Sequence, residues 1–359
     1  MIRWHVRPRH HLPPQPPYTD GTAPLPYPAG WFLLAPARHL RPGAVLTRQM
    51  MGQDVVVYRT HSGQARAIRP YCPHLGAHLG CGGRVEGETI VCPFHHFAFD
   101  ATGAVARTGP GYTGQAVQDR LDTLACQEAN GAIFAWFGHD PAQPPTWHIP
   151  NLLHPDAARP RFASTELAGH PQEIGENIVD IGHTRALHGI PDAELLAAPV
   201  PQEHRYTTEL RLSRAFPPFG KLTVDLTVTL HGLGLIHALV RAPRYGLTAD
   251  VLGSARPTAP WRVEFTLGTS ITLATDSPPW QHLPPTTTRL LSHAVNWLNL
   301  AAALRDVEPD LLVWNTKRYL QPPRLTQGDG PIGPFRLWAR QFYPGQETTD
   351  QPTDTNPTP

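Results

Sequence analysis

Two short cysteine-histidine pairs constrain this chain more than any other feature of its sequence. Cys72-x-His74 is followed, after a glycine-rich stretch, by Cys92-x-x-His95. The proline after each cysteine stiffens its turn, and the glycines between the pairs let the chain bend back, so the four side chains can converge on one centre. Two thiolates and two imidazoles suit tetrahedral zinc, or a [2Fe–2S] cluster with one iron on the cysteines and the other on the histidines.

The composition is that of a globular chain without a strong charge. The 359 residues are 40% hydrophobic and 16% charged, which favours two domains with a sizeable core. The net charge of +1 argues against a nucleic-acid-binding surface. No apolar run reaches the roughly 18 residues of a membrane helix, and the first residues lack the apolar core of a secretory signal. We therefore expect a cytoplasmic protein without a membrane span.

The order of the periodic segments predicts an α+β fold. Short β-like runs separated by turns indicate a small antiparallel β domain, and longer alternating runs beyond it precede a segment with helical periodicity. The expected long strands lie at 204–212, 221–230 and 261–275, and the helix at 286–319. The predicted division is a flexible arm over 1–25, a β domain over 26–147, a second domain over 148–343 and a disordered tail over 344–359.

A second candidate site has the pattern Asp180-x-x-His183-x4-His188. On a continuous helix Asp180 and His183 share a face, whereas His183 and His188 point away from each other. The helix must therefore distort or end near His188, and Gly189 stands where a left-handed C-terminal cap is expected. Two histidines and one carboxylate can hold Fe(II) and leave positions open for O₂. His183 and His188 supply only the two imidazoles, so a third ligand is still needed.

The segment CPHLGAHLG followed by CPFHHFAFD resembles the Rieske domain of Rieske non-haem iron oxygenases. The resemblance implies a Rieske [2Fe–2S] cluster on Cys72, His74, Cys92 and His95. The family usually has glycine after the last histidine of this motif, where His96 stands here. A structural zinc site is the alternative.

Two cysteines lie outside this ligand pattern. Rieske domains of the respiratory type carry an extra disulfide, so a bridge between Cys81 and Cys126 is an alternative to two free thiols. A reducing cytoplasm favours the free thiols.

The resemblance continues to about residue 343 and implies a helix-grip catalytic domain, an antiparallel sheet with helices that carry the mononuclear Fe(II). Asp310-x-x-Val313-Trp314 matches a helix of steroid-acting members, the relatives of 3-ketosteroid 9-alpha-hydroxylase and cholesterol 7-desaturase. The match implies Asp310 as the third ligand beside His183 and His188. Asp306 and Glu308 are the alternatives.

The family also implies a role for Asp180, which would link His183 to His95 of a neighbouring subunit in a homotrimer. Such a carboxylate orients the imidazole and couples the two metal centres. Glu176 and Asn177 also match the family motif, and a supporting role is expected for both.

No nicotinamide or flavin domain is apparent in the sequence. The only glycine fingerprint, at 328–333, contains Pro331, which cannot present a backbone N–H to a pyrophosphate. The electrons are therefore expected from a separate reductase, ferredoxin or both. The expected function is hydroxylation or desaturation, with O₂, of a small apolar substrate that is steroid-like or aromatic. The alternatives are a Rieske electron-transfer protein without oxygenase activity and a zinc-stabilised binding module.

Overall fold

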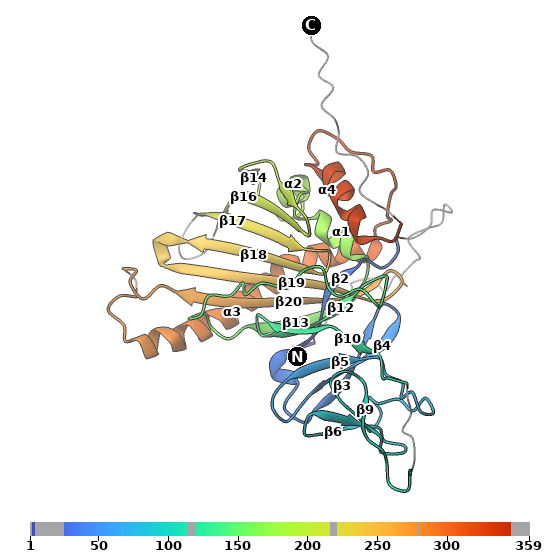
Figure 1. Ribbon diagram of the computed structural model, residues 1–359. Coiled ribbons are helices and arrows are strands. Elements are labelled where there is room, and N and C mark those ends of the chain that lie inside the picture. The colour runs from blue at the N-terminus through green and yellow to red at the C-terminus, as the bar shows by residue number, and fades with distance from the viewer. Residues whose placement is uncertain (1, 4–24, 114–118, 216–220, 279, 346–359) are drawn as a thin grey trace.

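The computed structural model describes residues 2–3, 25–113, 119–215, 221–278 and 280–345 (Figure 1). Most of the expected arm over 1–25 and of the tail over 344–359 lies outside these residues. The described part consists mainly of antiparallel strands with few helices, which confirms the α+β class.

Three small antiparallel sheets form the N-terminal part; the two that contain β3–β5 and β6–β9 lie at the bottom of Figure 1, and the one that contains β2 and β12 lies beside the large sheet. Their strands are β2 (Gly30–Pro36), β3 (Val45–Met50), β4 (Gln53–Arg59), β5 (Ala65–Ile68), β6 (Arg84–Glu86), β7 (Thr89–Val91), β8 (Ala98–Phe99), β9 (Val105–Arg107), β10 (Thr123–Leu124), β11 (Cys126–Ala129) and β12 (Ala132–Phe137). The sheets have the orders β10-β5-β4-β3, β11-β12-β2 and β6-β7-β8-β9.

Strand β4 shows how the sequence sets this arrangement. Its residues from Val55 to Tyr58 form an apolar, largely β-branched run, which is typical of a strand covered on both faces. Successive side chains point to opposite faces. Val55 and Val57 pack in one core, while Val56 and Tyr58 pack in another that also contains Cys72 and Cys92. The cysteines of the first motif are thus anchored on a two-sided β core.

A nine-stranded sheet forms the C-terminal part, in the order β1-β13-β20-β19-β18-β17-β16-β14 with β15 paired to β16. Its strands are β1 (Ile2–Arg3), β13 (Arg161–Ala168), β14 (Glu194–Leu195), β15 (Val200–Gln202), β16 (Arg205–Ala215), β17 (Lys221–His231), β18 (Leu235–Ala242), β19 (Leu247–Ala259) and β20 (Arg262–Leu273). All pairs are antiparallel except β1 with β13.

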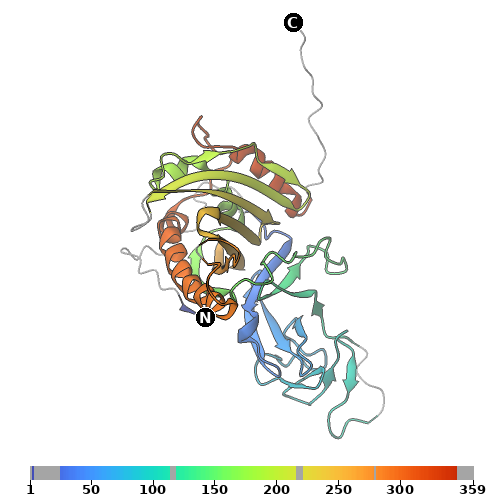
Figure 2. The ribbon, with the colours of Figure 1, turned by 90° about the vertical axis from the view of Figure 1, so that its left-hand side faces the viewer.

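Four helices accompany this sheet in the described part of the chain: α1 (Pro171–Glu176), α2 (Ile181–Ala186), α3 (Pro285–Thr316) and α4 (Ile332–Ala339). The long α3 packs along one face of the sheet over β20 and β13 (Figures 1 and 2). The shorter α1, α2 and α4 gather near one end, where α1 contacts α4. None of the described helices combines the length and apolar character needed to cross a bilayer.

Helix α3 was expected from its periodicity, but its N-terminal half turns polar side chains inward. Ser292 and Asn296 are buried, whereas Leu290 and Trp297 are exposed. The buried amide is satisfied, because Asn296 accepts a hydrogen bond from the Thr269 hydroxyl at 2.8 Å. The C-terminal half has the usual polarity, with Leu311 and Trp314 in a core with Phe265.

The two parts of the chain share a buried junction. Trp31 and Phe134 of the N-terminal sheets pack with Leu235 and Leu252 of the large sheet. Arg256 on β19 is buried there and donates from Nε to the carbonyl oxygen of Leu33 at 2.8 Å. A buried arginine with satisfied donors ties the two parts into one body.

Candidate metal centres

The two loops of the first motif follow the same backbone path. The N–H of Cys72 donates to the carbonyl of Ala77 at 2.9 Å, and that of Cys92 donates to Phe97 at 2.8 Å. Each cysteine therefore opens a turn that closes five residues later, although the histidine spacing differs between the loops. Both cysteines are buried at the base of these loops.

The two loops bring their histidines together. The ring centroids of His74 and His95 lie 4.7 Å apart, and the Tyr112 ring packs against both in T-shaped contacts. His74 Nδ1 is buried without a hydrogen-bond partner, which is the state expected of a nitrogen that binds a metal. Burial, together with the neighbouring Cys92, raises the pKa of the Cys72 thiol to about 11. A bound metal cation offsets this cost, because it stabilises thiolates. The donor set fits a [2Fe–2S] cluster.

Two positions around His95 explain local features of the sequence. His96 has φ +59°, in the left-handed region that favours glycine, so a residue with a side chain is strained at this position. At Gly109 an added Cβ would lie 1.6 Å from the carbonyl oxygen of His95, so only glycine fits. Sequence reasoning missed Gly109 and Tyr112, because neither has a recognisable spacing from the ligands.

The surface around these loops is apolar. Tyr71, Leu75 and Phe94 are 62%, 66% and 60% exposed.

All four cysteines are free, so Cys81 and Cys126 do not form the disulfide considered above.

The second site begins at the N-terminus of α2. The Asp180 carboxylate caps this helix by accepting the backbone N–H of His183 at 3.0 Å. The helix ends at Ala186, and Gly189 has φ +64°, so the predicted break before His188 is confirmed. The turn that follows brings the second imidazole back toward the first, and the two rings lie 5.2 Å apart at 75°.

Asp310 of α3 completes a group with these two histidines. The candidate ligand atoms of His183, His188 and Asp310 all lie within 4.8 Å of one another. His188 Nε2 is 3.2 Å from Asp310 Oδ2, and His183 Nε2 is 3.8 Å from Asp310 Oδ1. The alternatives Asp306 and Glu308 are not part of this group, and Glu308 is exposed.

The environment of this group suits a metal. Asp310 is only 4% exposed, and Asn177 donates from Nδ2 to its Oδ1 at 2.9 Å. Burial is the main cause that lowers the pKa of His183, which keeps the imidazole neutral and its lone pair available. Two imidazoles and one carboxylate form the facial arrangement of non-haem iron.

The structure gives Asp180 a different contact from the one expected. Its carboxylate accepts the backbone N–H of His183, while the ring nitrogen Nδ1 of His183 contacts the main-chain carbonyl oxygen of Asp180. The link to His95 of a neighbouring subunit involves a second chain and stays a prediction.

Comparisons with known families and proteins agree with this geometry. Residues 30–118 match the Rieske [2Fe-2S] domain, and residues 282–343 match the 3-ketosteroid 9alpha-hydroxylase C-terminal domain. The cholesterol 7-desaturase of Bombyx mori is 32% identical over 89% of this chain and 70% of its own length. A probable 3-ketosteroid-9-alpha-monooxygenase oxygenase component of Rhodococcus rhodochrous is 25% identical over 90% of this chain and 82% of its own.

Solved structures share the fold at lower identity. A variant of NdmA from Pseudomonas putida CBB5 with caffeine superposes with a TM-score of 0.65 at 17% identity, over 86% of this chain and 89% of that one. Dicamba monooxygenase bound to dicamba has a TM-score of 0.62 at 14% identity, over 87% and 96%.

The two candidate metal centres, the fold and the extent of the similarity lead to one assignment. The chain belongs to the Rieske non-haem iron oxygenases, enzymes with a Rieske [2Fe–2S] cluster and a mononuclear iron that require an electron donor, O₂ and a substrate.

Proposed function

We propose that this chain is the oxygenase component of a multi-protein system that hydroxylates or desaturates a bulky, apolar, steroid-like substrate. The observation that supports this substrate class best is the similarity over nine-tenths of the chain to cholesterol 7-desaturases, together with the C-terminal match to a ketosteroid hydroxylase domain. An aromatic substrate is the second candidate, because the similarly folded dicamba monooxygenase was solved with the aromatic compound dicamba.

The proposed ligands of the cluster are Cys72, His74, Cys92 and His95. Those of the mononuclear iron are His183, His188 and Asp310. The two buried cysteines, the unpartnered His74 nitrogen and the compact group around Asp310 support these assignments. When bound, the cluster supplies single electrons and the iron activates O₂.

The protein's own groups orient and shield the second centre. Asn177 engages one oxygen of Asp310, and the other oxygen faces His188. Asp180 fixes the first turn of α2 and with it the direction of His183. The burial of Asp310 excludes water from its carboxylate, which strengthens its interaction with a cation.

We further propose a homotrimer in which Asp180 lies opposite His95 of the next subunit. The exposed apolar side chains around the cluster loops support protein docking at that surface. A reductase, a ferredoxin or both would deliver electrons there.

We place the enzyme in the cytoplasm and the domain boundaries at 26–147 and 148–343. The family match at 30–118 and the separate sheets support this division.

Changing one iron ligand tests the oxygenase assignment. His183→Ala should lose the mononuclear iron and all turnover, while the visible absorption of the Rieske cluster is retained. Unchanged iron content and unchanged electron acceptance would favour the electron-transfer protein instead. A colourless wild-type protein that contains zinc would favour the binding module.

A substrate panel tests the proposed class. The reduced enzyme with O₂ should convert cholesterol or a 3-ketosteroid, as measured by mass spectrometry of the products. Conversion of dicamba or caffeine without conversion of any steroid would move the assignment to aromatic substrates.

A further inference from the structure

The first helix of the catalytic part, α1, buries more polar groups than its length explains. All six of its residues are buried, including Gln172, Glu173 and Glu176. Carboxylates lose their hydration on burial, so they are retained only where partners and a role offset the cost.

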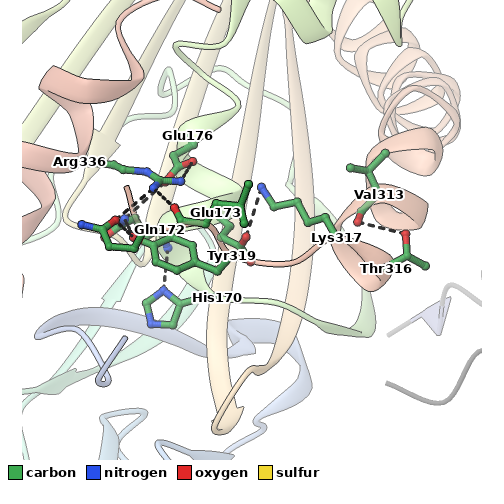
Figure 3. A network of polar contacts seen from close by, with 11 residues as sticks. His170, Gln172, Glu173, Glu176, Val313, Thr316, Lys317, Tyr319 and Arg336 are labelled. Carbon is green, nitrogen blue, oxygen red and sulfur yellow. Dashed lines mark hydrogen bonds and ion pairs between the residues drawn. The ribbon is translucent and has the colours of Figure 1, made fainter. Parts of the chain in front are cut away.

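The cationic partners of both carboxylates come from the chain that follows α3, as Figure 3 shows. Arg336 of α4 binds Glu176 through two contacts, Nε to Oε1 at 2.8 Å and Nη2 to Oε2 at 2.9 Å. Its guanidinium also lies 4.6 Å from the centre of the Tyr319 ring. Lys317 Nζ lies 3.3 Å from Glu173 Oε1. We call Glu173, Glu176, Lys317 and Arg336 the α1 clamp.

Neutral side chains complete this network. The Tyr343 hydroxyl donates to Gln172 Oε1 at 2.9 Å, and Gln172 Nε2 donates to the Tyr319 hydroxyl at 3.1 Å. At Gly175 an added Cβ would lie 3.0 Å from the Phe335 ring, so α1 and α4 approach closely. Helix α1 is thus held firmly by the C-terminal segment.

The clamp connects to the candidate iron ligands through α1 itself. Asn177, the residue after Glu176, caps α1 and donates to Asp310. Lys317 caps the end of α3, two turns beyond Asp310. Two contacts at different positions along α3 therefore join it to α1: Glu173 with Lys317, and Asn177 with Asp310.

Helix α3 needs such a support because Pro309 lies directly before Asp310. Proline has no N–H for the preceding turn, and its ring crowds the carbonyl four residues earlier, so a helix bends readily at this point. The backbone of α3 does not by itself fix where its last part, 310–316, lies. Its contacts with α1 add to the packing of Leu311 and Trp314 in the core with Phe265.

We propose that Arg336 and Lys317 are positioning residues for the mononuclear iron. By holding α1 against the last part of α3, the clamp keeps Asp310 at the distance from His183 and His188 that a shared metal requires. The proposal rests on the proposed iron ligands. It gives the segment 317–343 a function in metal affinity that is exerted through Asn177 and α3.

Metal affinity, measured anaerobically on the full chain, tests this role. Wild type and variants would be freed of mononuclear iron, titrated with Fe(II), and followed by the rate of iron loss to a chelator. The absorbance of the Rieske cluster in the same sample is the internal reference. Arg336→Gln should weaken Fe(II) binding about tenfold. This is the lower end of the loss of about 10- to 100-fold found when groups that orient metal ligands are removed. Lys317→Met should have a smaller effect.

A conservative variant sharpens the result. Arg336→Lys keeps the charge but loses the two-point contact with Glu176, so its Fe(II) affinity should fall between those of wild type and Arg336→Gln. Cluster content should be the same in all these proteins.

Two controls separate positioning from general stability. Arg211→Gln breaks an exposed two-point pair with Asp225 at 2.7 and 3.0 Å and should leave Fe(II) affinity unchanged. Leu252→Ala opens a buried site away from the clamp and lowers the unfolding temperature.

The outcomes distinguish the possibilities. Weaker Fe(II) binding in Arg336→Gln than in Leu252→Ala, at a similar loss of unfolding temperature, supports the proposal. Equal losses in both proteins, or wild-type affinity in Arg336→Gln and Lys317→Met, overturn it. A wild-type chain that binds its cluster but no Fe(II) overturns the proposed iron site, and the positioning role with it.

Discussion

The two candidate metal centres are built in opposite ways. The candidate cluster ligands come from two neighbouring loops with the same hydrogen-bond pattern, and each loop closes on itself within a few residues. The candidate iron ligands come from α2, from the turn after it and from α3, which the chain reaches only after crossing the large sheet. The first centre is therefore a local structure, whereas the second exists only when the whole catalytic part is folded and α3 is held in place.

The largest expected effect is the loss of turnover when a ligand of the second centre is changed, because the cluster should be unaffected. Asp310→Asn removes the proposed anionic ligand of the iron, so turnover should fall at least about a thousandfold, as for a lost catalytic group. The cluster should remain. Iron content, cluster absorbance and turnover measured on one sample check this, and a simultaneous loss of the cluster would show that the centres are not independent.

A change in a candidate cluster ligand tests whether the second centre forms without the first. Cys92→Ser should abolish the cluster and with it electron transfer to the second centre, because a serine oxygen is a poor ligand for this cluster. Fe(II) binding to the catalytic part should stay near the wild-type value in a titration. A protein unable to bind any iron would mean that the cluster also supports the fold of the catalytic part.

A smaller effect is expected from Gly109→Ala. The added methyl group meets the carbonyl oxygen of His95, and relieving that overlap should cost about 3 kcal/mol of unfolding free energy and part of the cluster content. Denaturant unfolding followed by cluster absorbance measures both. Gly328→Ala is the matched control, since its added methyl group meets nothing within 4 Å. Equal behaviour of the two variants would contradict the close approach.

The smallest effect concerns acid stability near the junction of the two parts. Burial, followed by nearby His237, His204 and Arg205, lowers the pKa of His231 to about 4, below its ordinary 6.5, and neither ring nitrogen has a hydrogen-bond partner. The folded state disfavours the protonated ring, so this contribution to stability is complete above pH 6.5 and is lost as the pH falls toward 4.

His231→Phe should therefore lose about 2 kcal/mol less unfolding free energy than wild type between pH 6.5 and 4. Denaturant melts at several pH values measure this difference. His154→Phe, at an exposed histidine, should keep the wild-type pH dependence. A wild-type slope in His231→Phe would show that other groups cause the acid sensitivity.

The sequence predicted the local centre more completely than the distant one, for the same physical reason. Spacing predicted Cys72, His74, Cys92 and His95 as candidate ligands, because ligands from two short loops leave a pattern in the chain. The break before His188 followed from helix geometry, and the structure confirms it. Asp310 was predicted as a ligand only through the family resemblance, since nothing in local spacing connects it with the histidines.

Other elements were hidden by their polar side chains. Strand β19 contains the buried Asp250 and Arg256, so it lacks an apolar alternation. Helix α1 is short and contains two carboxylates, a pattern typical of an exposed segment. It is buried because Lys317 and Arg336 pair with those carboxylates. Such elements depend on partners far along the chain, and local patterns do not contain that information.

Counting iron and acid-labile sulfide per chain in anaerobically purified protein tests the central claim most directly. A Rieske cluster together with a mononuclear iron predicts about three irons and about two sulfides per chain. About two irons with two sulfides would leave an electron carrier without an oxygenase centre, and protein without sulfide would contradict the cluster itself.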